Sequence, residues 1–236
     1  MGDKLLVGAR RARFPSLWYA LAVLGIDPAE VLIIAATLLF SLSIHESAHA
    51  WTADRLGDAT ARFMGRVTLN PLAHIDPLGT IVFPILGLVS GGFIFGWAKP
   101  VPVNPQRLKR PKTDHLLIAA AGPVSNVAAA AGFFLLLKTA TAFLPGSLLE
   151  DHVVLSPLFL LCRTGLVINV VLAVFNLIPI PPLDGSWILS GLVPDGVSSL
   201  INRIRPYGFM LLLLFLMSGA LGSILYPVLS WVNGLL

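Results

Sequence analysis

The sequence predicts an all-α membrane protein, a polytopic helical bundle of about five to six spans. Hydrophobic residues make up 56% of the 236-residue chain and charged residues only 12%, about half of the charged fraction that is typical of a soluble domain. Several apolar runs approach the length of about 20 residues that a helix needs to cross a bilayer. The remaining length suffices only for short connections, so we expect a single domain over residues 1–236.

The expected spans follow one another along the chain. Leu17 to Ile26 is a short first span or an interfacial helix, and a strong transmembrane helix runs from Glu30 to about Ala53. Three further apolar stretches cover Leu116 to Phe143, Leu155 to Ile178 and Tyr207 to Trp231. No internal repeat relates them, which favours a simple bundle.

A short extended or re-entrant segment is expected near residues 68–105. Leu78 to Trp97 is apolar but interrupted by glycine and proline, and Lys99 to Pro105 alternates proline with β-branched and polar residues, which favours extended backbone. If the apolar stretch crossed the membrane, basic residues would lie on both sides, against the positive-inside rule. A segment that returns to the side it left removes this conflict.

The net charge of +4 reflects membrane topology, because no basic stretch is interleaved with stacking aromatic residues. We therefore expect a lipid bilayer as a partner and no nucleic acid. Arg55, Arg62 and Arg66 follow the strong helix and place its end near the cytoplasm. The single cysteine, Cys162, excludes an intrachain disulfide and a zinc site built from several cysteines.

The most informative motif lies within the strong helix, where residues 45–49 read His-Glu-Ser-Ala-His. Residues four apart share one face of a helix, so His45 and His49 can bind one metal ion, with Glu46 beside them as a proton acceptor. Two imidazoles and a carboxylate are costly in lipid without a function. The motif predicts a hydrolytic zinc site with Glu46 as the base.

A third protein ligand is expected elsewhere, because a catalytic zinc ion normally has three and keeps one position open. Asp54, His74 and Asp76 are candidates, but they lie at the helix end or in the interrupted segment. Asp184 is favoured. The prolines before it and Gly185 after it predict a turn that can aim the carboxylate at a metal.

The sequence resembles the site-2 protease family of intramembrane zinc metalloproteases, in the small prokaryotic branch that lacks PDZ and CBS domains. Residues 45–49 match the first family motif, and Asn-Leu-Ile-Pro-Ile-Pro-Pro-Leu-Asp-Gly at 176–185 matches the second. The stretches at 68–80, 96–105 and 122–126 are also similar to this family. The resemblance extends over nearly the whole chain.

This resemblance implies regulated intramembrane proteolysis, the hydrolysis of peptide bonds within transmembrane segments of a membrane protein substrate. It implies one Zn²⁺ ion per chain, bound by His45, His49 and Asp184, with Glu46 as the general base. It also implies an integral protein of a prokaryotic cell membrane, with water reaching the active site from the cytoplasmic side.

Two asparagines are candidates for contact with the substrate. The resemblance assigns Asn176 to substrate binding or to stabilisation of the oxyanion, and Asn126 could support the site from a neighbouring span. Either side chain could instead form a hydrogen bond between helices. The extended segment near Val101 and Val103 is expected to pair with substrate backbone, because a transmembrane helix must unwind locally before it is cut.

Two other classes of protein stay open. A transporter or metal carrier also contains broken helices and buried acids, although no inverted repeat supports that class here. A catalytically silent relative could bind membrane proteins without cutting them. Glu46 separates these classes, since hydrolysis requires the base and metal carriage does not.

Overall fold

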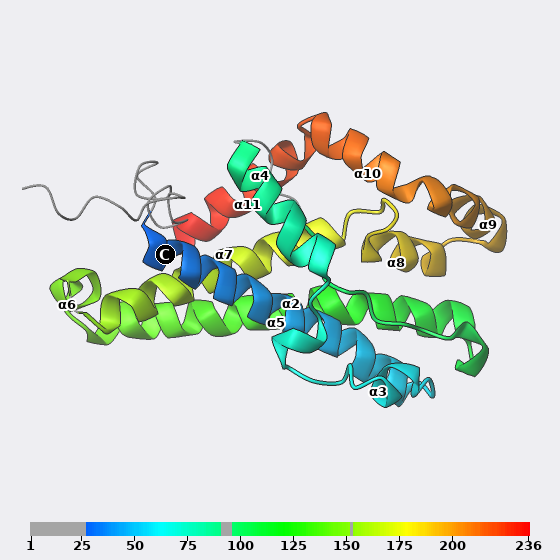
Figure 1. Ribbon diagram of the computed structural model, residues 1–236, viewed down its shortest axis with the longest axis horizontal. Coiled ribbons are helices and arrows are strands. Elements are labelled where there is room, and N and C mark those ends of the chain that lie inside the picture. The colour runs from blue at the N-terminus through cyan, green and yellow to red at the C-terminus, as the bar shows by residue number, and fades with distance from the viewer. Residues whose placement is uncertain (1–26, 91–95, 152) are drawn as a thin grey trace, which may run out of the picture.

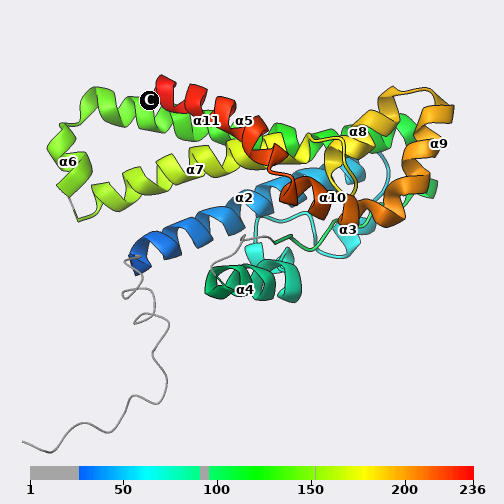
Figure 2. The ribbon, with the colours of Figure 1, turned by 90° about the horizontal axis from the view of Figure 1, so that it is seen from above.

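Three long helices form the centre of the molecule. The computed structural model describes residues 27–90, 96–151 and 153–236, and within them α2, α5 and α7 pack side by side (Figure 1, Figure 2). These helices cover Pro28–Arg55, Pro111–Phe143 and Leu155–Asn176. The predicted all-α class is confirmed, and the described residues contain no strand.

Local sequence signals set the ends of α2. The carboxylate of Asp27 accepts a hydrogen bond from the backbone N–H of Ala29 at 2.8 Å, and Pro28 occupies the first helical position. The helix ends just before Gly57, whose φ of 110° lies in a region that favours glycine. The observed helix therefore extends the predicted one by about one half-turn at each end.

Shorter helices connect and cover the three long ones. They are α3 (Thr60–Phe63), η1 (Pro71–Ala73), the π-helix η2 (Pro77–Val82), α4 (Phe83–Ser90), η3 (Pro105–Arg107), α6 (Gly146–Asp151), α8 (Asp184–Leu192), α9 (Asp195–Ile204), η4 (Arg205–Tyr207), α10 (Gly208–Met217) and α11 (Ala220–Leu235). Of these, α8 packs against α5, and α11 packs against α7.

Four helical stretches are long and apolar enough to cross a membrane. They are Ala29–Arg55, Pro111–Phe143, Leu155–Asn176 and Asp195–Met217, and two shorter apolar helices cover Pro77–Gly87 and Ala220–Leu235. Many large apolar side chains on these helices are exposed, as lipid-facing surfaces require. The chain is therefore an integral membrane protein.

The segment near residues 68–105 returns to its starting side. Its first half forms η1, η2 and α4, whereas the described residues 96–104 form no helix or strand. The backbone N–H of Trp97 donates to the carbonyl of Gly79 at 3.1 Å, and that of Lys99 donates to the carbonyl of His74 at 2.9 Å. These bonds place the end of the segment beside its beginning, so the basic residues before and after it lie at the same end of the bundle.

The last apolar stretch forms two helices, α10 and α11, instead of one. The prediction of one helix from Tyr207 to Trp231 is wrong, because α10 ends at Met217 and α11 begins at Ala220. Gly219 between them has a φ of 76°, a left-handed conformation that interrupts a helix. The predicted element Leu17 to Ile26 lies outside the described residues.

Candidate active site

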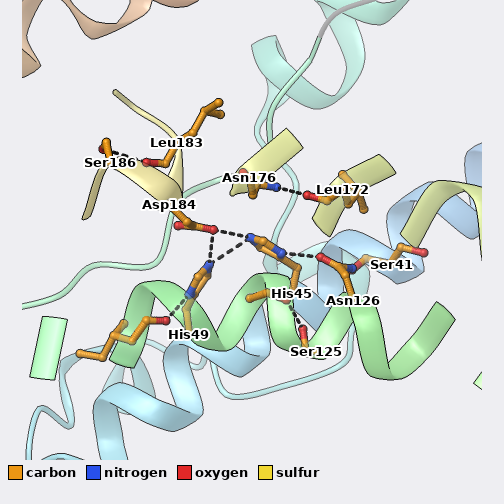
Figure 3. Close-up of polar contacts among 12 residues, drawn as sticks. Ser41, His45, His49, Ser125, Asn126, Leu172, Asn176, Leu183, Asp184 and Ser186 are labelled. Atoms are coloured by element: carbon orange, nitrogen blue, oxygen red, sulfur yellow. Dashed lines mark hydrogen bonds and ion pairs between the residues drawn. The ribbon is translucent and has the colours of Figure 1, made fainter. Parts of the chain in front are cut away.

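The two histidines of α2 face each other across one helical turn. The distance between their Nε2 atoms is 3.0 Å, and both side chains are buried. Asp184, the first residue of α8, points toward both imidazoles (Figure 3). Its Oδ2 atom lies 3.1 Å from Nε2 of His45 and 3.3 Å from Nε2 of His49. We call these three residues the ligand cluster.

The hydrogen bonds behind the imidazoles determine which nitrogens carry protons. Nδ1 of His45 lies 2.6 Å from Oδ1 of Asn126, and Nδ1 of His49 lies 2.7 Å from the carbonyl oxygen of Ile118. Both partners are acceptors, so each Nδ1 donates and each neutral ring presents the lone pair of its Nε2 to the cluster.

With both rings neutral in this tautomer, three lone pairs converge on one point. Oδ2 of Asp184 is buried and has no hydrogen-bond donor in the described part of the chain. Such an arrangement is repulsive unless a cation lies at its centre. Ligand atoms about 2.0–2.1 Å from a tetrahedral zinc ion lie about 3.3 Å apart. The observed separations of 3.0–3.3 Å suit this ion.

A glycine on α5 makes room for the imidazoles. A Cβ atom at Gly122 would lie 2.6 Å from Nε2 of His45 and would also overlap the ring of His49. Such a distance is far shorter than a van der Waals contact. The hydrogen at this position therefore lets α5 lie directly against the face of α2 that carries His45 and His49.

A buried polar chain supports His45 from behind. Asn126 donates from Nδ2 to Oδ1 of Asn169 at 2.8 Å, and Asn169 donates to Oγ of Ser41 at 2.8 Å (Figure 3 labels Ser41 and Asn126). All three residues have 0% exposure. Neither Ser41 nor Asn169 had a role predicted from the sequence. A polar residue at the centre of an apolar span was the signal that could have found Asn169.

A cleft of about 440 Å³ lies beside the ligand cluster. Glu46 and Asn176 line it together with all three ligands, whereas Asn126 is absent from its lining. The carboxylate of Glu46 forms no hydrogen bond within the described part of the chain, while Nδ2 of Asn176 donates to the carbonyl of Leu172 at 3.0 Å. This placement favours a supporting role for Asn126 and leaves Asn176 able to contact a substrate.

The opposite wall of the cleft is the extended segment of residues 96–103, which we call the strap. Arg66 is buried and donates to the carbonyls of Ala73, Lys99 and Pro100. Residues 101 and 103 line the cleft, and their backbone groups form no hydrogen bond within the described ranges. The middle of the strap is thus held by a buried cation.

Asp58 holds the residue that directly follows the strap. Its carboxylate accepts hydrogen bonds from the backbone N–H of Asn104 at 2.6 Å and from Thr60. Burial acts to raise the pKa of Asp58, but the bonds from Thr60 and Asn104, with the charge of Arg107, outweigh burial and hold that pKa below its usual value.

The other acids and histidine considered as ligands lie outside the ligand cluster. Asp54 pairs with Arg62 at 3.3 Å, and Asp76 caps η2 by accepting from the backbone N–H of Gly79 at 2.7 Å. Nε2 of His74 lies 2.8 Å from the carbonyl of Thr68, a bond within the connecting loop. The fold and the cluster together define a membrane metalloenzyme.

Known proteins identify the family. The model of peptidase family M50 matches residues 147–218. "Putative zinc metalloprotease YwhC" of Bacillus subtilis is 40% identical over 205 residues, which cover 84% of this chain and 85% of that protein. "Putative zinc metalloprotease Rip2" of Mycolicibacterium smegmatis is 28% identical and covers 85% of this chain and 72% of its own length. No solved structure gives a significant match.

The chain belongs to peptidase family M50, the site-2 protease family of zinc metalloproteases. Its cofactor is zinc, and the ligand cluster is the group of residues in the described structure that could hold the ion.

Proposed function

We propose that this protein is an intramembrane zinc metalloprotease that hydrolyses peptide bonds within transmembrane segments of other membrane proteins. The observation that carries the proposal is the convergence of three unsatisfied lone pairs on a cleft wall that also presents Glu46. In this proposal residues 1–236 act as a single domain with one zinc ion, bound by His45, His49 and Asp184.

Glu46 is the general base. When bound, zinc lowers the pKa of a water molecule toward neutrality and polarises a carbonyl group. The carboxylate of Glu46 lines the same cleft without a hydrogen-bond partner in the described structure, so it is free to accept the proton of the attacking water. It then passes this proton to the leaving amine.

Asn176 contributes a hydrogen-bond donor to the reacting carbonyl. Its amide nitrogen carries two hydrogens, and the bond to Leu172 uses one of them. The second is available to the oxyanion or to the backbone of the substrate. Asn126 acts through His45, because its carbonyl oxygen holds the imidazole in the required tautomer.

The strap binds the unwound substrate. Val101 and Val103 line the cleft, and their backbone N–H and C=O groups have no partner within the described residues. An extended peptide can pair with such groups whatever its side chains are. The strap therefore suits substrates that share a backbone conformation more than a sequence.

The active site opens toward the cytoplasm in this proposal. The re-entrant segment places Arg55, Arg62 and the basic residues of the following loop, 107–112, at one end of the bundle. An excess of arginine and lysine marks the cytoplasmic side. His49 lies six residues before the end of α2, which corresponds to about 9 Å of helix, so water has a short path to the cluster.

The decisive experiment combines zinc content with cleavage of a helix-destabilised transmembrane peptide by detergent-purified protein. We expect Glu46→Gln to retain zinc and lose cleavage by at least about 100-fold. We expect Asp184→Ala to lose both. Glu30→Gln, an exposed acid on the same helix, is the matched control and should leave both unchanged. Zinc without base-dependent cleavage would indicate a metal carrier or a silent relative.

A further inference from the structure

A three-layer stack of side chains lies next to the ligand cluster. The guanidinium carbon of Arg205 lies 3.2 Å from the ring centroid of Trp187, and the imidazole of His115 lies 3.9 Å from the same indole with an angle of 13° between the planes. Two groups cannot occupy one ring face at these distances. The indole of Trp187 therefore lies between Arg205 and His115.

The stack joins three elements that are distant in sequence. His115 belongs to α5, Trp187 to α8 and Arg205 to η4. Trp187 follows Asp184 by three residues, so the stack fixes the helical turn next to that ligand. His115 and Trp187 also line the cleft.

Arg205 bonds directly to the first turn of α8. Its Nη1 donates to Oγ of Ser186 at 3.2 Å, and Oγ of Ser186 donates to the carbonyl of Leu183 at 2.8 Å. Its Nε donates to Oδ1 of Asn202 at 2.9 Å, which fixes the guanidinium from the other side. A chain of contacts thus runs from α9 through Arg205 to the residues on both sides of Asp184.

Helix α8 depends on such external contacts. It has only nine residues, and no side chain caps its first N–H groups. Helices this short are marginal by themselves, and the proline-rich turn before α8 offers no regular hydrogen-bonding pattern. The position of Asp184 must therefore be set by what α8 packs against.

We propose that Arg205 and Trp187 are positioning residues for the metal centre, because they hold α8 at the distance from α2 at which Asp184 completes the ligand cluster. His115 provides the opposing surface on α5. This inference rests on the proposed function of Asp184 as a zinc ligand. Loss of partners of this kind, which orient a ligand, typically weakens metal binding by 10–100-fold.

The test measures how fast a chelator removes zinc from the detergent-purified protein. We expect Arg205→Gln and Trp187→Leu to release zinc about tenfold or more faster than the natural sequence. Arg205→Lys keeps the charge but loses the planar stacking group, and should show an intermediate rate. Arg203→Gln, an exposed neighbour on α9, is the matched control and should be unchanged.

A second readout distinguishes positioning from general stability. The visible absorption of the Co²⁺-substituted protein depends on the coordination geometry. We therefore expect a changed spectrum in Arg205→Lys. This is the mildest variant and is expected to fold. Asp184→Ala should release zinc rapidly if Asp184 is a ligand. If it does, but the Arg205 and Trp187 variants keep the natural zinc release rate and Co²⁺ spectrum, the positioning inference is overturned while the ligand assignment stands. Normal zinc retention by Asp184→Ala would instead overturn the ligand assignment and this inference with it.

Discussion

The two walls of the cleft are built in opposite ways. The metal wall consists of side chains on α2, α5 and α8, and buried hydrogen bonds fix both imidazoles. The strap wall is extended backbone, anchored at its middle by Arg66 and just beyond its end by Asp58. Residues 101 and 103 form no backbone hydrogen bonds within the described structure. One wall therefore has its polar side chains fixed by buried hydrogen bonds, whereas the other leaves backbone groups at residues 101 and 103 without partners in the described structure, as the proposed pairing with substrate requires.

The largest effect should come from crowding the metal wall. In Gly122→Ala the new Cβ would overlap imidazoles that cannot retreat, because Asn126 and Ile118 hold them from behind. We expect zinc affinity to fall by about 100-fold, measured by metal analysis after competition with a chelator. Gly132→Ala on the same helix meets nothing within 4 Å and should keep its zinc. Equal behaviour of the two variants would contradict the close approach of α5.

Removing the support of His45 should have the next largest effect. Asn126→Leu takes away the acceptor of the Nδ1 proton and the donor to Oδ1 of Asn169. We expect a loss of 10–100-fold in zinc affinity and a similar loss in kcat/KM. Ser125→Ala, which removes only a bond to the carbonyl of Gly122 on the same helix, is the control. Tight zinc binding by Asn126→Leu would show that the metal wall is less fixed than we describe.

The strap wall should respond in KM and not in metal content. Arg66→Gln removes a cation that binds three carbonyl groups, so we expect stability to fall by about 3 kcal/mol and KM to rise several-fold. Faster hydrogen exchange at Lys99 and Trp97 should accompany this change. Arg62→Gln, at an exposed ion pair, is the control. Loss of zinc from Arg66→Gln would mean that the two walls are not independent.

The smallest effect should be a pH dependence of the stability that Asp58 contributes by holding the residue after the strap. The pKa of Asp58 is lowered in the folded protein, so its contribution to stability is present above its unfolded pKa of about 3.9 and is lost as pH falls through the lower folded value. We expect Asp58→Asn to lower Tm by about 3 °C at pH 7. The difference should shrink below about pH 4. A difference that is constant with pH would show that the carboxylate is not the anchor.

The sequence was most informative where function depends on local spacing. One helical turn between His45 and His49 is a property of any helix, so their proximity could be predicted without the fold. The proline-rich turn before Asp184 singled out that residue by its chemistry, and the structure brings it within 3.3 Å of both imidazoles. Its role as a ligand stays a prediction, as do the roles of Glu46 and Asn176.

The partners of the supporting residues could not be predicted because they are remote in sequence. Asn169 and Ser41 are separated by 128 positions, and the stack of Arg205 on Trp187 depends on where α9 and η4 turn. The break at Gly219 was missed for a different reason, since apolar composition alone cannot distinguish one long helix from two short ones. Most of the features that the sequence did not predict therefore depend on tertiary contacts, which no local pattern encodes.

The hydrogen atom of Gly122 has a mechanical consequence. Because α5 rests on the imidazoles themselves, α2 and α5 cannot slide past each other without moving His45 and His49. The contact between these helices is therefore expected to stay fixed, so any widening of the cleft would have to come from elements that carry no residue of the ligand cluster. The strap, α7 and α10 line the cleft without contributing such a residue.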